Sequence, residues 1–318
     1  TDEAFSGSFD GNGHKLISNG YGIFNTISEN GVVEDLVREI SGSGRSFEIF
    51  GGIANINYGT IRNCYVSGSA ASQKDCGGIA GENIGGTVIG CRFDGSVRAT
   101  ESGAGGIVGY NSYGTIERCF SDASVRASGH GAGGIVGDNS FGTVKDCHTA
   151  GTVNGDSEAG GIAGRLYNGS ILSSYSVCNV SGNSDLGGIY GAQIENGYVE
   201  NSYYRTGANN DALNADQSSS FGKDSNAMNL SSTYAGFDLD AVWAIDEGRD
   251  TPALRDTEGA GTRTQPYIIR SAEDFSNIQS GRKLYYELAN DISGVSGIGG
   301  EFTGALNGNG HTISASGT

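Results

Sequence analysis

A short repeat dominates the chain and limits what it can fold into. Six copies of a glycine-rich unit follow one another at intervals of 26 to 28 residues. The copies begin at Gly51, Gly77, Gly105, Gly133, Gly160 and Gly187. A unit of this length cannot bury an apolar face by itself, so neighbouring copies must stack and share one core. The sequence therefore predicts one repetitive architecture rather than ordinary independent domains.

The residue types within each copy favour strands over helices. The copies combine many glycines with β-branched pairs such as Ile107-Val108 and Ile135-Val136, which disfavour helices and favour strands. Glycine makes up 56 of the 318 residues and proline only 2, without a Gly-X-Y period, which excludes a collagen-like chain. The predicted fold is all-β, a parallel β-helix (β-solenoid) with coils of about 27 residues that pair in parallel about 4.8 Å apart.

Stacked coils place equivalent residues of successive copies above one another as ladders. We expect three ladders in the core, formed by Ile53, Ile79, Ile107, Ile135, Ile162 and Ile189, by Ile61, Val88, Ile116, Val144, Ile171 and Val199, and by Val97, Val125, Val153 and Val180. Asn83, Asn111 and Asn139 are predicted to form a side-chain amide ladder at a turn. The same register places Glu117 opposite Lys145, a pairing of opposite charges that favours the alignment.

Four of the six cysteines, Cys64, Cys91, Cys119 and Cys147, share one ladder position. Their spacing predicts a structural ladder of buried, reduced thiols that pack as small apolar groups. Stacked residues have parallel Cβ vectors, which suit a disulfide poorly. Cys76 and Cys178 lie off this ladder, about four coils apart, and are not expected to pair with each other.

The segments that flank the repeats divide the chain further. Residues 1–50 are expected to form the first coils, residues 51–204 the six repeats, residues 205–258 a closing cap, and residues 259–318 a small α+β opening segment of a following module. The last segment reads as a strand, a helix from about Ser271 to Gln279, and a strand. EFTGALNGNGHTISASG near the end repeats AFSGSFDGNGHKLISNG near the start at an offset of 297 residues.

The repeated G-G-I-x-G-x-N-x-x-G-T-I-x-x-C pattern resembles the GLUG-motif family of secreted and surface proteins. The F-x-G-x-x-(D/N)-G-N-G-H motif at Phe5–His14 and at Phe302–His311 is also similar, as are the GTRTQPYII segment and the closing WAIDEGRDTPAL segment. The resemblance implies an extracellular solenoid of the kind found in adhesin-like proteins and as a non-catalytic region of IgA-protease-type peptidases. The family carries no catalytic residues in these repeats, so none is transferred to this chain.

Charge and motifs exclude several function classes. A formal net charge of −17 disfavours nucleic acid and anionic membranes, and the apolar runs are too short for membrane insertion. No catalytic constellation is present, and the aligned acids are expected to remain single within their ladders, so we expect no enzyme and no catalytic residue. The D-G-N-G-H turn at Asp10 has Tyr21 where a calcium loop needs Glu, so neither a metal site nor a cofactor is expected, apart from adventitious calcium.

One row of residues follows the cysteines along the chain. It consists of Tyr65, Arg92, Phe120, His148, Tyr175 and Tyr203. If the cysteines point inward, this row points outward, and Tyr65, Phe120, His148, Tyr175 and Tyr203 become candidate binding residues for a glycan or a host protein. The alternative is an aromatic ladder that only stiffens the solenoid. A second pair, Tyr113 and Phe141, lies at a turn and is expected to pack locally.

These observations predict a non-catalytic structural or adhesive solenoid in an extracellular or cell-surface protein. Its expected partners are neighbouring modules of the same chain or other copies in a head-to-tail filament. Alternatives are a glycan- or host-protein-binding module that uses the aromatic row, and the stalk of a secreted peptidase. The chain begins with Thr1 rather than Met, which suggests a processed or excised segment.

Overall fold

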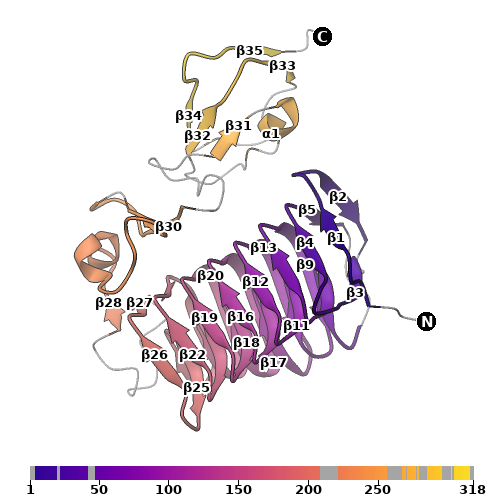
Figure 1. The fold of residues 1–318 in the computed structure, drawn as a ribbon. Helices are drawn as coiled ribbons and strands as arrows, with labels where there is room; N and C mark the ends of the chain where they lie inside the picture. The colour runs from indigo at the N-terminus through magenta and orange to yellow at the C-terminus, as the bar shows by residue number, and fades with distance from the viewer. Residues whose placement is uncertain are drawn as a thin grey trace. The chain divides into compact units, whose positions relative to one another are not determined.

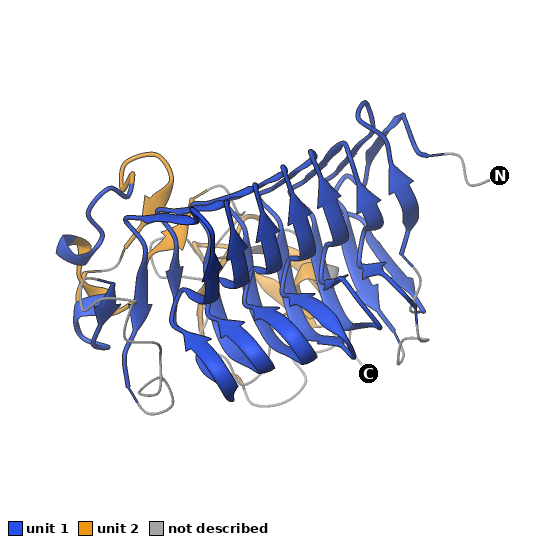
Figure 2. Cartoon of the chain, turned by 90° about the horizontal axis from the view of Figure 1, so that it is seen from below, with its two compact units in different colours: residues 1–228, 232–237 blue, residues 229–231, 238–318 orange. Residues whose placement is uncertain are grey.

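The computed structural model describes residues 4–19, 22–41, 47–207, 221–245, 247–255, 267–269, 271–276, 278, 285–295, 302 and 304–315. The chain divides into two compact units, which Figure 2 draws in different colours. Unit 1 comprises residues 1–228 and 232–237, and unit 2 comprises residues 229–231 and 238–318.

Unit 1 is a parallel β-solenoid of about seven turns, so the all-β fold and the β-helix predicted from the repeats are confirmed (Figure 1). Successive turns add strands to three sheets, in which every neighbouring pair is parallel. Sheet A contains β3 (Phe24–Ile27), β7 (Ala54–Asn57), β11 (Ala80–Ile84), β15 (Val108–Ser112), β18 (Val136–Ser140), β21 (Ala163–Tyr167) and β25 (Tyr190–Ile194).

Sheets B and C form the other two faces of the solenoid. Sheet B contains β1 (Ser8–Asp10), β4 (Val32–Glu34), β8 (Thr60–Arg62), β12 (Thr87–Ile89), β16 (Thr115–Glu117), β19 (Thr143–Lys145), β22 (Ser170–Leu172) and β26 (Tyr198–Glu200). Sheet C contains β2 (Lys15–Ser18), β5 (Val37–Ile40), β6 (Phe50–Gly51), β9 (Tyr65–Ser72), β10 (Cys76–Gly77), β13 (Arg92–Ala99), β14 (Ser102–Gly105), β17 (Phe120–Gly133), β20 (His148–Gly160), β23 (Tyr175–Ser176), β24 (Asn179–Gly187), β27 (Tyr203–Arg205) and β28 (Gly222–Lys223).

The core of unit 1 consists of the ladders that the sequence predicts. The six isoleucines from Ile53 to Ile189 are completely buried. The second ladder is held in register by strand pairing, for example Val88 on Ile116 and Ile116 on Val144, and only its last member, Val199, is partly exposed. Identical or similar β-branched side chains therefore fill a narrow interior in which each coil repeats the one before it.

The predicted amide ladder is present and one residue longer than expected. The Nδ2 of Asn83 donates to Oδ1 of Asn111 at 2.8 Å, and the Nδ2 of Asn111 donates to Oδ1 of Asn139 at 2.7 Å. Asn57 joins at the start and donates to Asn83 at 2.7 Å. Each buried amide also donates to a backbone carbonyl of its own turn, such as that of Gly114 at 3.1 Å from Asn111. A Cβ at Gly114 would lie 2.2 Å from Nδ2 of Asn83, so the turn after the asparagine requires glycine.

Unit 2 contains short elements. The antiparallel pair is β29 (Trp243–Ala244) with β30 (Ala253–Leu254), and the parallel elements are β31 (Tyr267–Ile269), β32 (Tyr285–Leu288), β34 (Ala305–Asn307), β33 (Ile292–Val295) and β35 (Ile313–Ala315). The helix α1 (Ala272–Ser276) starts where the Oγ of Ser271 accepts a hydrogen bond from the backbone N–H of Asp274 at 3.1 Å. Gln279, the expected last residue of this helix, lies outside the described residues. The segments η1 (Ala227–Asn229) and η2 (Ser231–Thr233), each divided between the two units, are single 3-10 turns. No helix in the described residues is long and apolar enough to cross a membrane.

The amide ladder predicts a position-dependent cost of substitution. Asn111→Ala leaves a buried donor on Asn83 and a buried acceptor on Asn139 with one partner fewer, so we expect a loss of about 2–3 kcal/mol in stability. Thr152→Ala is the control, because the bond of its exposed hydroxyl to Ser124 lies at the surface. The urea midpoint of unfolding measures both variants. Equal midpoints would show that the ladder contributes no more than a surface hydrogen bond.

Candidate functional site

A ladder of left-handed backbone conformations marks the corner where sheet C ends and each Gly-Gly pair begins. Each member of this ladder comes directly before a residue of sheet C that is paired with its equivalent in a neighbouring coil. The members and their φ angles are Asp75 (39°), Gly103 (69°), Gly131 (76°), Glu158 (56°) and Asp185 (52°). Two neighbouring coils have glycine here, whereas the coils on either side have acids. The missing side chains leave a hollow in the surface at this corner.

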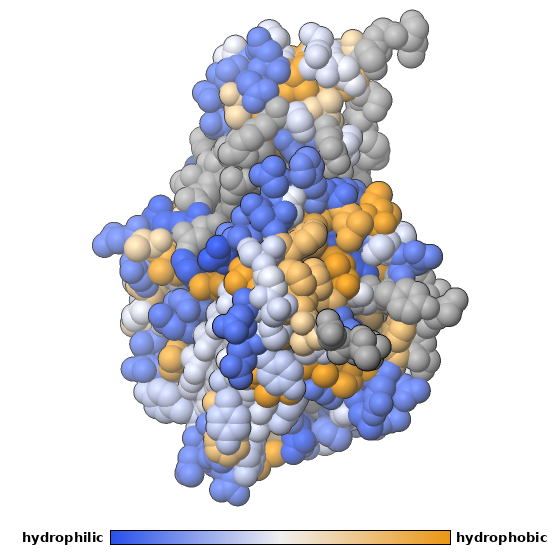
Figure 3. Space-filling model, turned by 45° about the vertical axis from the view of Figure 1, so that its right-hand side comes forward, coloured by the Kyte–Doolittle hydropathy of each residue, from blue (hydrophilic) through white to orange (hydrophobic). Residues whose placement is uncertain are grey.

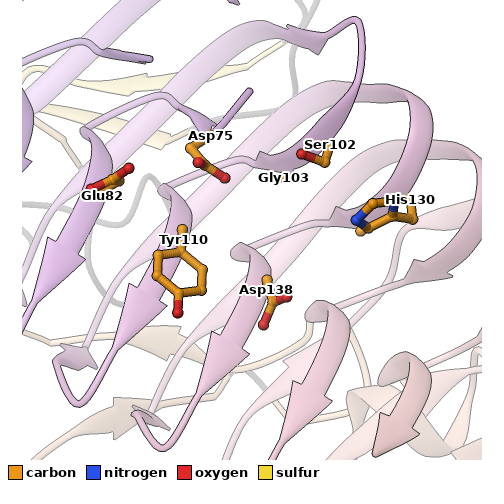
Figure 4. A pocket seen from close by; sticks show the side chains of 8 residues that line it. Asp75, Glu82, Ser102, Gly103, Tyr110, His130 and Asp138 are labelled. Atoms are coloured by element: carbon orange, nitrogen blue, oxygen red, sulfur yellow. The ribbon is translucent and has the colours of Figure 1, made fainter. Parts of the chain in front are cut away.

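This hollow is a pocket of about 230 Å³ (Figure 4). It is lined by Asp75, Glu82, Ser102, Gly103, Tyr110, His130, Gly131 and Asp138. Glu82, Tyr110 and Asp138 are equivalent residues on β11, β15 and β18, and form one wall. Ser102 and His130 are paired across β14 and β17 and form the opposite wall. Glycine at position 103 keeps this hollow open, because a Cβ there would lie 2.3 Å from Oδ1 of Asp75.

The expectation that acids stay single is wrong at this corner. Three carboxylates, from Asp75, Glu82 and Asp138, line the same pocket. Glu82 and Asp138 occupy the same ladder two coils apart, and Asp75 reaches the pocket from a different ladder. A comparison within one ladder cannot detect such a cluster, because the acids meet across two faces of the coil. The sequence signal that could have indicated this pocket is the glycine at Gly103 and Gly131, where the neighbouring coils have an acid.

Burial and mutual repulsion perturb the acids of the pocket. Burial raises the pKa of Asp75 to about 7, and the nearby Glu82 and Asp138 add to the shift. Burial also raises the pKa of Glu82 and that of Asp138. Arg165 opposes the shift of Asp138, and its Nη1 lies 3.3 Å from Oδ2 of that residue. The pocket therefore contains one carboxyl that exchanges its proton near neutral pH.

The carboxylates surround the pocket without forming a metal centre. Among the described residues, no group of three or more His, Cys, Asp or Glu side chains could hold a metal ion. The arrangement offers hydrogen-bonding groups and a protonation equilibrium around a small hollow. It brings together none of the five candidate binding residues of the aromatic row, since none of them lines the pocket.

All six cysteines are buried thiols that form no disulfide. Each ladder thiol donates to the carbonyl oxygen two residues before it, at 3.3, 3.4, 3.3 and 3.2 Å for Cys64, Cys91, Cys119 and Cys147. Ser174 and Ser202 continue the ladder and donate to the equivalent carbonyl at 2.8 and 3.0 Å. The position thus needs a small side chain with one short donor. Burial raises the pKa of Cys76 to about 12 and that of Cys178 to about 11.

The aromatic row stacks along the outer face of sheet C. Arg92 lies over the rings of Tyr65 and Phe120, at 5.6 and 5.0 Å from their centroids. The ring of His148 lies 4.2 Å from that of Phe120 and 5.1 Å from that of Tyr175. Burial, followed by the charge of Arg92, lowers the pKa of His148 to about 3, so the stacked imidazole is neutral at physiological pH.

The outward exposure expected for the whole row is wrong at its end. Tyr175 and Tyr203 are only 1% and 8% exposed. Tyr234, from the non-repetitive segment after β28, has its ring 5.6 Å from each of these tyrosines in edge-on geometry. Tyr65, Phe120 and His148 remain partly exposed. A binding role for the row stays a prediction, and its accessible part is limited to these three residues and Arg92.

A second aromatic group occupies the turns between sheets A and B. Tyr113 and Phe141 are 67% and 43% exposed, and their rings stack at 4.8 Å with an interplanar angle of 4°. The local packing expected for the pair is present, but most of the Tyr113 side chain is open to solvent. Both residues have a φ of 55°, which bulky side chains rarely adopt.

The backbone conformation of Tyr113 and Phe141 costs more free energy than the stacking of their rings contributes. Left-handed backbone at a residue other than glycine costs about 1–3 kcal/mol, so two such residues cost about 2–6 kcal/mol. A stacked aromatic pair contributes about 0.5–1.5 kcal/mol beyond the area that it buries. The equivalent position is Gly85 in the preceding coil and Asn168 in the following coil, both of which adopt this conformation more readily. Ring stacking alone therefore does not offset the backbone cost of this pair.

Asp75 predicts an unusual pH dependence of stability. Its pKa is about 7 in the folded chain and has a reference value of 3.8, so the folded state holds the extra proton between these values and stability falls as the pH rises from about 4 to 7. Asp75→Asn removes the buried charge and keeps a residue type that tolerates φ 39°. We expect this variant to be about 1–2 kcal/mol more stable than the parent at pH 8, allowing for partial exposure, and equal to it at pH 4. Denaturant titrations at both pH values measure the difference. A difference that does not change with pH would refute the assignment.

The buried thiols predict protection from alkylation. All six thiols are buried, and burial raises the pKa of Cys76 and of Cys178, so the folded chain should react with a thiol reagent at pH 8 about 100-fold more slowly than the chain in denaturant. After unfolding under non-reducing conditions, all six cysteines should react. Fewer than six reactive groups would reveal a disulfide and contradict the reduced ladder.

Comparisons with known proteins agree with this architecture. Residues 100–126 match the family model described as "The GLUG motif". The solved structure named "IgA1 Protease" superposes with a TM-score of 0.51 and 15% identity, over 67% of this chain and 18% of that one. A Bacteroides ovatus structure that carries the provisional name immunoglobulin A1 protease has a TM-score of 0.49 and 21% identity, over 78% of this chain and 76% of that one. No curated protein sequence matches the chain.

At 15% identity, the structure named "IgA1 Protease" shows a shared fold. The chain corresponds to less than a fifth of the length of the IgA1 protease chain. The matched motif spans the turn before β14 and continues into β17, which is one complete coil of the solenoid. The resemblance predicted from the repeats is therefore confirmed: the chain carries the GLUG motif on a parallel β-solenoid whose fold is shared with part of an IgA1 protease.

Proposed function

We propose that the chain is a non-catalytic, structural and adhesive segment of a secreted or cell-surface protein. In this proposal it is one module of an array, in which each solenoid packs end to end against the next. The GLUG motif and the shared solenoid fold support a region of this kind. The interior of unit 1 is filled by ladders whose members contact their own copies, which suits a stiff spacer.

The observation that carries the proposal is a duplicated turn. β1 and β2 are joined by Asn12 and Gly13, with φ angles of 46 and 70°. β34 and β35 are joined by Asn309 and Gly310, with φ angles of 46 and 79°. The backbone N–H of His14 donates to Gly11 at 2.8 Å, and that of His311 donates to Gly308 at 2.7 Å. The same structural element therefore occurs twice, once in each unit.

The two copies differ in what lies beside them. In unit 2, β32 pairs in parallel with β34, and β33 pairs with β35. In the described part of unit 1, β1 and β2 pair only with β4 and β5 of the next coil. Phe9, Leu16 and Ile17 on these strands are 39%, 39% and 59% exposed. Figure 3 brings this end of the solenoid forward and shows apolar residues gathered there.

We infer that a segment equivalent to β32 and β33 covers the outer edge of β1 and β2 in the array. That segment can come from elsewhere in the same polypeptide or from another copy. Exposed strand edges with apolar side chains readily pair with further strands, and a head-to-tail contact of this type is open-ended. The name of the IgA1 protease structure also keeps open the narrower role of a non-catalytic stalk in a secreted peptidase.

The array predicts concentration-dependent association through this edge. The mass of the chain, measured by light scattering after size-exclusion chromatography, should rise with concentration in the micromolar range. Ile17→Lys places a charge on an exposed side chain of the edge and should reduce the association at least fivefold without changing the unfolding temperature. Thr152→Lys is the matched control, because its exposed side chain lies on β20, which is paired on both sides by β17 and β24 and is not at an end of the solenoid. A parent chain that stays monomeric, or equal effects of both substitutions, would contradict the proposal.

A further inference from the structure

We propose that the open face of the Tyr113 ring is a binding subsite for one pyranose ring of a neutral glycan. This inference rests on the adhesive role proposed above and gives that role a ligand class. Phe141 supports the ring from behind, and Gly85 in the preceding coil leaves the space in front of it free. The site lies in the turns between sheets A and B, apart from the aromatic row of sheet C.

Backbone hydrogen bonds align these turns from coil to coil. The N–H of Gly85 donates to Ser112 at 2.8 Å, that of Tyr113 to Ser140 at 3.0 Å, and that of Phe141 to Tyr167 at 2.9 Å. Gly85, Tyr113 and Phe141 are therefore consecutive members of one ladder. Their φ angles of 64, 55 and 55° show that the three turns share one conformation.

The stacked pair has an open face on the side of Tyr113. The rings of Tyr113 and Phe141 are almost parallel, so each covers one face of the other. Beyond Phe141, the ring of Tyr167 lies 5.3 Å away with an interplanar angle of 81°. On the other side of Tyr113 the ladder position is Gly85, where an added Cβ would meet no atom within 4 Å. The face of Tyr113 that is turned away from Phe141 is therefore accessible.

The conformation of the turn argues that these rings are retained for a role outside the fold. Glycine and asparagine fit the same turn in the neighbouring coils, at Gly85 and Asn168. Tyr113 and Phe141 adopt a backbone conformation that disfavours bulky side chains, yet neither ring is buried in the core. Large exposed side chains on strained backbone are typical of binding sites.

The size and charge of the platform favour a sugar ring over a protein or an anion. Two partly exposed rings offer roughly 200 Å² of surface, whereas a stable protein partner needs about 800 Å² on each side. The aliphatic C–H face of a pyranose matches one aromatic face in size and polarity. The net charge of −17 disfavours acidic polysaccharides and nucleic acids. A neutral glycan is the ligand class that satisfies all three constraints.

Substitutions that respect the turn can test the subsite. Tyr113→Asn removes the platform and installs the residue type of the equivalent position Asn168, and Gly85→Asn places a side chain in front of the platform. The probes are immobilised gluco-, manno-, galacto- and N-acetylglucosamine oligosaccharides. We expect the parent chain to bind at least one probe, Tyr113→Asn to lose at least tenfold in affinity, and Gly85→Asn to lose at least threefold. The unfolding temperature of Tyr113→Asn should be unchanged or higher.

Tyr198→Asn is the matched control, because it removes another exposed tyrosine from the same solenoid, 53% exposed on β26, and should leave binding unchanged. Three results would overturn the subsite: a parent chain that binds none of the probes, a Tyr113→Asn variant that binds as well as the parent, or equal losses in Tyr113→Asn and Tyr198→Asn. If the chain adheres to protein-coated but not to glycan-coated surfaces, the adhesive role survives and the glycan subsite fails. The light-scattering result for Ile17→Lys is independent of all these outcomes.

Discussion

Parallel pairing of each coil with the next, in one continuous register, is the constraint on which the structure depends. It places each residue directly beside its equivalent in the neighbouring coil, as with Val125 between Val97 and Val153. Side chains that tolerate a copy of themselves are therefore selected inside the solenoid: isoleucine and valine by shape, cysteine by size, and asparagine because its amide both donates and accepts. The same constraint stacks His148 between the rings of Phe120 and Tyr175, where burial and then the charge of Arg92 lower its pKa.

Register also governs the polar surface of the solenoid. A charged residue faces the residue at the same position one coil away, so opposite signs in adjacent coils favour the pairing. Lys145 lies 3.9 Å from Glu117, and Arg165 lies 3.3 Å from Asp138. Around Asp75, several acids lie together with few cations. Burial, followed by the charges of the neighbouring acids, raises the pKa of Asp75 to about 7, so its carboxyl is partly protonated near neutral pH. The clustered acids of the corner pocket therefore destabilise the fold at neutral pH, in contrast to the opposite-charge pairs elsewhere on the solenoid.

The interior of the solenoid could be predicted from the sequence because the same residue types recur at the same position of each repeat. The period gives the register, and the register gives the ladders, so the buried isoleucines and the amide ladder followed without three-dimensional data. Asn57 escaped detection because its turn is one residue shorter, with only Tyr58 and Gly59 before Thr60, where the next coil has three residues between Asn83 and Thr87.

The candidate site was far less predictable than the interior, because it depends on relations that do not repeat. Tyr175 and Tyr203 are covered by a segment outside the repeats, so their burial cannot be derived from the period. The acids of the corner pocket come from two ladders, and sequence alignment compares residues only within one. The duplicated turn at His14 and His311 was visible in the sequence, but the strand that covers one copy became visible only in the paired strands of unit 2.

The pocket and the open aromatic face of this solenoid both lie where a ladder of side chains is interrupted by glycine. A uniform ladder presents the same side chain on every coil and leaves no cavity, because each member fills the space beside its neighbour. Glycine at Gly103 and Gly131 opens a hollow between acidic corners, and glycine at Gly85 exposes the face of Tyr113. In both places the fold tolerates the interruption because the backbone ladder continues through it. A repeat protein of this kind can therefore acquire a binding surface by losing a side chain on one coil, without altering the core that holds the coils together.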